Sequence, residues 1–395
     1  MKNLTRLLLL SFAFFYACQS TEEHASTNSK KWSPLLSYLD SVALQSVVDS
    51  TTVGISWGII LPDQDMVVQS HGLAKIAPEV PLTTSTKSGI ASITKPFTAT
   101  LIGLLVEEGR LDLYQTLDQF FPDFPDGDKT TIYQLLSHTS GIPDWWMGGL
   151  PETDVPTNWT SEANRHKTLQ RMNQVYLFDP GTQFFYSNSG FALLADIIER
   201  ATGKTYEEVL HERIIIPLAL NQTVLGDPTA DTLDAIGYGI QQSDSTRSIT
   251  YEARASISTS LNAFGGIRTT IGDLLSFTKA LSQGDLLSLA FFEQMSTYAE
   301  VNSGLPVYEA PYWPAEWGEF SSPPYMEKSG YGLGLNLTEM YGQQVIWHSG
   351  GMPGYNAIWC YLPEKDIHFA LLANTDNGAV PAFEVFIKML TKEQG

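Results

Sequence analysis

Apolar positions along the chain predict strands at both ends and helices in the middle. Leu35, Leu39, Val42 and Val47 recur at helical spacing, which predicts a helix over 32–50. Mainly helical patterns with Pro and Gly breaks fill the middle of the chain. The predicted strands cover 53–61, 66–73, 332–338, 344–348, 357–362 and 367–374, the helical middle covers 92–201, and a closing helix covers 381–391.

This order predicts an α+β fold. We expect an antiparallel sheet formed from N- and C-terminal segments and flanked by helices, with a mainly helical inserted subdomain. The predicted sheet subdomain combines 33–105 with 255–395, and the helical subdomain covers 106–254. The stretches 227–260 and 300–329 are predicted to be irregular, and loops of that length are usually functional or mobile. The second stretch contains four aromatic residues, Tyr308, Tyr312, Trp313 and Trp317. They could wall a substrate cleft, but we expect them to pack the loop onto its own domain.

The N-terminus indicates an export signal. Lys2 and Arg6 precede an apolar run that is too short to span a bilayer, so 1–17 is predicted to be a signal peptide. The Cys18 that follows resembles the lipidated cysteine of bacterial lipoproteins, and 18–32 would then be a polar tether. Ordinary secretion and a retained anchor are the alternatives. We expect a periplasmic or cell-surface protein that contacts membrane only through lipid on Cys18.

Charge and cysteine content exclude several classes of protein. The chain has 23 Lys plus Arg against 43 Asp plus Glu, and its net charge of -20 would repel nucleic acid. Its two cysteines, Cys18 and Cys360, cannot form a disulfide scaffold. Because Cys and His residues lack zinc-site spacing, the sequence implies neither a metal nor an organic cofactor. Nothing in the pattern points to one oligomeric state.

Two SxxK patterns offer a serine beside a lysine, and their positions separate them. Ser92 lies at the start of an apolar helix, since Pro96 is tolerated only in a first turn. The free N–H groups and positive end of a helix favour a developing alkoxide there. Lys95 projects from the same face as Ser92, and burial would lower its pKa enough for it to act as a base. Ser276, three residues before Lys279, falls inside a helix and is predicted to be structural.

A third serine lies in a different pattern. Gly54-Ile55-Ser56-Trp57-Gly58 matches the GxSxG nucleophile elbow, which needs a strand, a sharp turn and a helix. Here the β-rich run continues through Leu61 into a hairpin, so Ser56 is predicted to be an ordinary strand residue.

Two later motifs supply partners for Ser92. Tyr186-Ser187-Asn188 follows a Pro-Gly turn and precedes a helix, so the phenol could relay protons and Asn188 could orient Lys95 or a substrate carbonyl. The competing interpretation is a buried tyrosine and a helix-capping asparagine. His348-Ser349-Gly350 ends a strand, where glycine lets a substrate approach the backbone, and Lys328-Ser329-Gly330 is a rival for that role.

In combination, these motifs resemble the serine β-lactamase and penicillin-binding-protein superfamily, in the branch of class C β-lactamases, D,D-peptidases and family VIII esterases. The resemblance implies Ser92 as the acylated nucleophile, Lys95 and Tyr186 as the proton-handling pair, and Asn188 as a polar site residue. It also implies an oxyanion hole from the N–H groups of Ser92 and Gly351. The segments that carry it are 90–98, 135–143, 180–188, 264–266, 331–334 and 348–354.

One departure from the family pattern bears on the substrate. His348 stands where class C β-lactamases have Lys, and a histidine is only partly charged at pH 7, which argues against efficient β-lactam hydrolysis. We therefore expect a serine hydrolase for small-molecule or peptidoglycan-like ester or amide substrates, of carboxylesterase, D,D-carboxypeptidase or D-amino-acid peptidase type. A class C-like β-lactamase and a catalytically idle binding module are the alternatives. The resemblance also implies that substrate specificity resides in the loop walls, which here would be Trp145, Trp146 and 300–329, and that His138 belongs to a structural helix end outside the site.

Overall fold

A computed structural model describes residues 31–62, 64–144, 176–226, 234–243, 246–253, 262–311 and 325–391. The predicted signal peptide, Cys18 and nearly all of the tether lie outside the described residues. So do Trp145 and Trp146, together with Tyr312, Trp313 and Trp317 of the second long loop. Within the described ranges, no helix combines the length and apolar character needed to cross a membrane.

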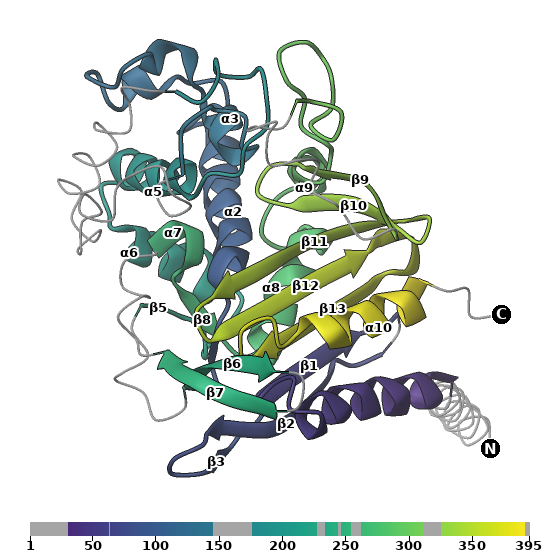
Figure 1. The fold of residues 1–395 in the computed structure, drawn as a ribbon. Helices are drawn as coiled ribbons and strands as arrows, with labels where there is room; N and C mark the ends of the chain where they lie inside the picture. Colours follow the sequence, from purple (N-terminus) through teal and green to yellow (C-terminus); the bar gives the residue numbers. More distant parts are fainter. Residues whose placement is uncertain are drawn as a thin grey trace, which may run out of the picture.

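In the described chain, eight antiparallel strands form the main sheet, and strands from the two ends of the chain pair at its centre (Figure 1). Strand β1 (Gly54–Ile60) lies between β2 (Val67–Lys75) and β13 (Ile367–Ala373). The predicted α+β fold is therefore confirmed. The sheet order is β3-β2-β1-β13-β12-β11-β10-β9, in which β3 is Val80–Pro81, β9 Met326–Tyr331, β10 Asn336–Met340, β11 Gln343–Met352 and β12 Tyr355–Leu362.

Two smaller sheets accompany the main one. Strands β4 (Ser88–Gly89), β8 (Ile267–Thr269) and β5 (Val224–Leu225) form one, and β6 (Gly237–Ser243) with β7 (Thr246–Ala253) forms a hairpin. The hairpin contradicts the prediction that all of 227–260 is irregular. Strand β9 likewise contradicts the prediction of an irregular 300–329. The subdomain boundaries stay predictions.

Helices cover both faces of the main sheet, and alternate strand residues point into two separate cores. In β13, Phe369 and Leu371 pack in the core beneath the N-terminal helix (31–48) and α10 (Val380–Thr391). Leu372 packs in the larger core on the other face, with α2 and α8. The remaining helices are α2 Thr94–Glu107, α3 Ile132–Leu136, α5 Asn188–Thr202, α6 Tyr206–Leu210, α7 Asn262–Gly265, α8 Ile271–Gln283 and α9 Leu289–Met295, with short turns η1 Ala91–Ile93, η2 Leu117–Gln119, η3 Gly127–Lys129, η6 His211–Ile215 and η10 Pro363–Lys365.

Helix α2 is the centre of the larger core. It is buried along most of its length and packs against α5, α6 and α7 (Figure 1). Phe97 in its first turn stacks on Phe277 of α8, with ring centroids 3.6 Å apart. The start of this helix is thus packed against α8, which in turn packs on β1 and β13. Ser92 immediately precedes this start and Lys95 lies within it.

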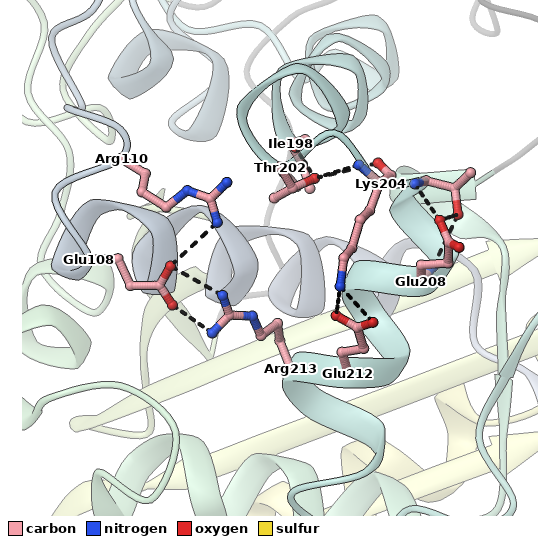
Figure 2. Close-up of polar contacts among 9 residues, drawn as sticks. Glu108, Arg110, Ile198, Thr202, Lys204, Glu208, Glu212 and Arg213 are labelled. Carbon is pink, nitrogen blue, oxygen red and sulfur yellow. Dashed lines mark hydrogen bonds and ion pairs between the residues drawn. The ribbon is translucent and has the colours of Figure 1, made fainter.

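The other end of α2 reaches the surface, where an ion pair connects it to η6 (Figure 2). Glu108 accepts two hydrogen bonds from Arg213, at 2.6 and 3.2 Å. Nearby, Lys204 donates to Glu212, and Thr205 and Glu208 form a capping box at the start of α6. Exposed pairs of this kind contribute only about 0–1 kcal/mol each, so burial of α2 anchors the helix.

Candidate active site

Ser92 lies in the short turn η1, immediately before α2. The preceding Ala91 has a φ of 44°, a left-handed conformation that is strained for a residue with a Cβ. The turn leaves Ser92 partly exposed, whereas Lys95, in the first turn of α2, has no exposed surface. An attacking hydroxyl is therefore accessible from solvent while its neighbouring amine is not.

The Lys95 amine contacts three acceptors from three parts of the chain. Its Nζ donates to Ser92 Oγ at 3.1 Å, to Asn188 Oδ1 at 2.7 Å and to the carbonyl oxygen of Phe264 at 3.0 Å. Burial lowers the pKa of Lys95 from 10.5 to about 7, against the opposing charge of Asp144. A large fraction of Lys95 is neutral at pH 7, so its lone pair can accept the Ser92 proton.

Tyr186 lies on the other side of the same amine. The Lys95 Nζ is 4.7 Å from the centre of the Tyr186 ring. Burial raises the pKa of Tyr186 well above its usual value, although a hydrogen bond with Ser92 opposes that shift. The phenol consequently keeps its proton at neutral pH and is a donor, whereas Lys95 is the group suited to act as a base.

Asn188 is the first residue of α5, and a carboxylate accepts hydrogen bonds from its backbone and side-chain N–H groups. Ser187, not Asn188, caps the helix, since its side chain accepts from the Gly190 N–H. Asp144 Oδ2 accepts from the Asn188 backbone N–H at 2.9 Å and from Asn188 Nδ2 at 2.8 Å. The Asn188 oxygen therefore faces Lys95, and the helix-capping interpretation is wrong.

His138 contacts the site, contrary to the prediction that it lies outside. It is buried at the end of α3, its φ is 59°, and its ring centroid is 4.2 Å from that of Tyr186. Its Nδ1 accepts from the Ser187 backbone N–H at 3.1 Å. Burial, with Lys95 and His348 nearby, lowers the pKa of His138 well below its usual value, so the ring is neutral and supports the Tyr186-Ser187 backbone.

One edge of β11 lies beside Ser92. Pairing of β10 with β11 ends at Trp347, whereas β12 pairs with β11 as far as Met352. No strand in the described chain pairs with the edge at 348–352, which lies next to η1 and the start of α2 (Figure 1). A Cβ on Gly350 would lie 1.9 Å from the Ile90 oxygen and 3.1 Å from the Ser92 nitrogen, so glycine alone permits this approach.

His348 is a buried neutral group. Its Nδ1 lies 2.7 Å from the Ser349 carbonyl oxygen and its Nε2 lies 2.9 Å from the Tyr331 hydroxyl. Because a carbonyl only accepts, Nδ1 carries the proton and Tyr331 donates to Nε2. Burial, reinforced by Lys95, lowers the pKa of His348 to about 3, so the expected partial charge at pH 7 is wrong. Ser349 points to the opposite face of the strand and contributes its carbonyl.

The competing serines and the rival motif lie elsewhere. Ser56 is buried in β1 and shares a hydrogen bond of 2.8 Å with Ser70. Ser276 donates to the Gly272 carbonyl within α8. Lys328 is exposed on β9 and pairs with Glu339. The structure thus brings together Ser92, Lys95, Tyr186, Asn188 and the β11 edge, and it separates the alternatives from them.

Comparison with known proteins identifies the family of the chain. Residues 39–390 match the Beta-lactamase family. The chain belongs to that family. Penicillin-binding protein 4* of Bacillus subtilis is 30% identical over 305 residues, which cover 73% of this chain and 61% of the relative. D-aminopeptidase of Brucella anthropi is 25% identical over 321 residues, which cover 81% of this chain and 56% of the relative. The match to this β-lactamase-family chain therefore spans 61% of the length of the first relative and 56% of the length of the second.

Solved structures of the same fold include two with high coverage. The octameric penicillin-binding protein homologue from Pyrococcus abyssi has a TM-score of 0.74 and 27% identity, covering 91% of this chain and 78% of that one. D-amino acid amidase from Ochrobactrum anthropi has a TM-score of 0.72 at 24% identity, covering 91% of this chain and 100% of that one. The second likeness concerns the fold alone.

Sequence reasoning missed three contributors to the site: the Asp144 carboxylate, the His138 ring and the Phe264 carbonyl. Asp144 directly follows the His-Thr-Ser-Gly-Ile-Pro segment, so its place beside a family motif was the available signal. The Phe264 contact uses a backbone carbonyl, which every residue type has, so the side chain gives no signal. Only the position of Phe264 in the 264–266 motif could have indicated it.

Proposed function

We propose that the protein is a serine hydrolase that cleaves ester or amide bonds through an acyl-enzyme on Ser92. The observation that carries this proposal is the buried Lys95 amine, 3.1 Å from the partly exposed Ser92 hydroxyl and with a pKa lowered to about 7. An ordinary lysine would require about 4–5 kcal/mol to lose its proton at pH 7, and burial removes most of that cost. Family membership supports the same chemistry.

In the proposed reaction, Ser92 Oγ bonds to the substrate carbonyl carbon as its proton passes to Lys95 Nζ. The oxyanion accepts hydrogen bonds from the Ser92 and Gly351 N–H groups, and each donor of this kind is worth about 100- to 1000-fold in rate. Tyr186, which keeps its proton at neutral pH, supplies a proton to the leaving group and recovers one from Lys95. Water then cleaves the acyl ester and restores the Ser92 hydroxyl.

Within this reaction class, we favour amides or esters whose leaving group carries no carboxylate. The neutral His348 offers no cation to pair with a carboxylate of the substrate. This disfavours β-lactams and the release of a C-terminal residue that carries a free carboxylate. The relatives named D-aminopeptidase support D-amino-acid amides or peptides as the acyl donors. A panel of D- and L-amino-acid amides, nitrophenyl esters and nitrocefin tests this order, and nitrocefin as the fastest substrate would overturn it.

The nucleophile is tested by covalent labelling. A fluorescent fluorophosphonate should label the wild-type protein and leave Ser92→Ala unlabelled, because Ser92 Oγ lies 3.1 Å from the Lys95 amine that can take its proton. Ser276→Ala and Ser56→Ala are matched controls, since these serines donate to or share hydrogen bonds within α8 and β1, and both variants should keep full labelling. A binding module without activity would show no difference between wild type and Ser92→Ala.

A further inference from the structure

Asp144 is a buried carboxylate directly behind Asn188. Its side chain is 2% exposed, and one of its oxygens, Oδ2, accepts from both the backbone N–H and the Nδ2 of Asn188, at 2.9 and 2.8 Å. Charge-assisted hydrogen bonds of this kind are among the stronger ones in proteins. Asp144 therefore fixes both the start of α5 and the orientation of one amide.

The orientation of the Asn188 amide determines which of its atoms contacts the Lys95 amine. With Nδ2 directed at Asp144, the Asn188 oxygen faces Lys95 Nζ at 2.7 Å. A flipped amide would place its oxygen against the carboxylate and its NH₂ against the amine, and both contacts would be repulsive while Lys95 is protonated. The carboxylate consequently selects the rotamer in which Asn188 holds the amine beside Ser92.

Asp144 also acts on Lys95 through its charge. Among the described residues, the polar groups that contact Lys95 are Ser92, Asn188 and the Phe264 carbonyl, with the Tyr186 ring and the neutral rings of His138 and His348 nearby. None of these groups carries a negative charge. Asp144 does, and it raises the pKa of Lys95 against the larger effect of burial.

We propose that Asp144 is a positioning residue of the acylation step, which locks the Asn188 amide with its oxygen toward Lys95 and sets the pH range in which Lys95 accepts the Ser92 proton. This inference rests on the proposed function, because it assigns Asp144 a part in the reaction of Ser92. The competing interpretation is that Asp144 only caps the first turn of α5, in which case it would affect stability and leave the reaction unchanged.

Two substitutions separate geometry from charge. In Asp144→Asn, the amide oxygen can still accept both Asn188 donors, but the charge is gone. In Asp144→Ala, the acceptor is lost as well. Each protein is reacted with the fluorophosphonate across the pH range in which a group with a pKa of about 7 titrates, and the labelling rate is fitted to a midpoint and a plateau. Thermal unfolding of both variants is measured in parallel.

Loss of the negative charge disfavours protonated Lys95, so both variants should have a midpoint about one pH unit below that of the wild type. Asp144→Asn should keep its plateau within about threefold of the wild type, because the amide keeps the hydrogen-bond geometry. Asp144→Ala should lose about 10- to 100-fold at the plateau, since a misplaced amine no longer lies in line with Ser92.

Asp273→Asn is the matched control, because Asp273 also accepts two hydrogen bonds, from the Gln222 N–H and from Thr223, but lies on α8. It should change neither midpoint nor plateau. A wild-type midpoint in both Asp144 variants, or a wild-type plateau in Asp144→Ala, would overturn the assignment, even if the melting temperature falls. Absence of labelling in the wild type would instead refute the proposed function, and the role of Asp144 with it.

Discussion

At the level of single residues, a strained backbone and a buried amine flank Ser92, the proposed nucleophile. Ala91, at a φ of 44°, holds a conformation that costs about 1–3 kcal/mol, and this cost is offset by the packing of η1 between β11 and α2. The turn leaves Ser92 partly exposed, while α2 keeps Lys95 inside the larger core. Exposure of the nucleophile and burial of the base follow from the same turn.

His138 provides a prediction at this scale. Its Nδ1 accepts from the Ser187 N–H, and its backbone is left-handed. Asparagine tolerates that backbone and carries an acceptor at the same position, whereas alanine has none. We expect His138→Ala to lower the fluorophosphonate labelling rate at least about tenfold, because the unsatisfied N–H costs about 1–3 kcal/mol next to Tyr186. His138→Asn should retain most of the rate.

The comparison between the two variants is the test, and it is made on protein whose folded fraction is established by circular dichroism. Equal losses in His138→Ala and His138→Asn would mean that the ring contact with Tyr186, and not the acceptor, supports the site.

Residues that lie close together in the sequence could be combined from their spacing alone, whereas distant partners such as Tyr186 and Asn188 were combined with Ser92 through their motifs and the family resemblance. Ser92 and Lys95 share one helix turn, so their contact at 3.1 Å followed from helix spacing. Asp144 and Asn188 are joined by tertiary packing across 44 positions, and no local pattern encodes that distance. The neutral state of His348 was also out of reach, because burial by other elements decides it.

At the level of elements, the site depends on how closely β11 approaches η1. Gly350→Ala would place a Cβ 1.9 Å from the Ile90 oxygen, so the strand or the turn must move. Since a displacement of about 1 Å can cost about 100-fold in rate, we expect labelling of Ser92 to fall by about that factor. Gly351→Ala is the neighbouring control for stability, because a Cβ there meets no atom within 4 Å.

Melting temperatures and labelling rates of the two variants, measured side by side, check this expectation. Gly350→Ala should melt below the wild type, and Gly351→Ala should melt close to it. A Gly350→Ala protein with normal labelling would show that β11 does not need its close approach to η1.

Helices and strands could be predicted where the pattern of apolar residues was strong. Strand β13 extends over Ile367–Ala373, close to the predicted 367–374, because every one of its residues is buried and apolar residues dominate it. Strand β9 was missed, since its sequence Met-Glu-Lys-Ser-Gly-Tyr is largely exposed at the edge of the sheet and has no apolar alternation. The β6-β7 hairpin was missed because its sequences, Gly-Tyr-Gly-Ile-Gln-Gln-Ser and Thr-Arg-Ser-Ile-Thr-Tyr-Glu-Ala, contain many polar residues and no sustained apolar alternation.

At the level of the whole molecule, the sheet separates two cores, and only one of them surrounds the site. Lys95 and the start of α2 lie on the face of the larger core, with Phe97 and Phe277. The N-terminal helix and α10 cover the other face. Pairing of β1 with β13 joins strands from the N-terminal and C-terminal parts of the chain into the single sheet on which both cores depend.

This separation predicts that stability and reactivity respond to different substitutions. Phe386 of α10 is fully buried on the face away from Ser92, with its ring 5.8 Å from Trp57 and 6.1 Å from Phe369. Phe386→Ala should cost about 3–5 kcal/mol and lower the melting temperature, because a large cavity forms in the second core. Below the unfolding transition the labelling rate of Ser92 should stay at the wild-type value, since no contact of Lys95 changes. Val380→Ala, at an exposed position of the same helix, should shift neither quantity. A labelling rate that falls in Phe386→Ala while the protein is still folded would mean that the sheet transmits strain between its faces.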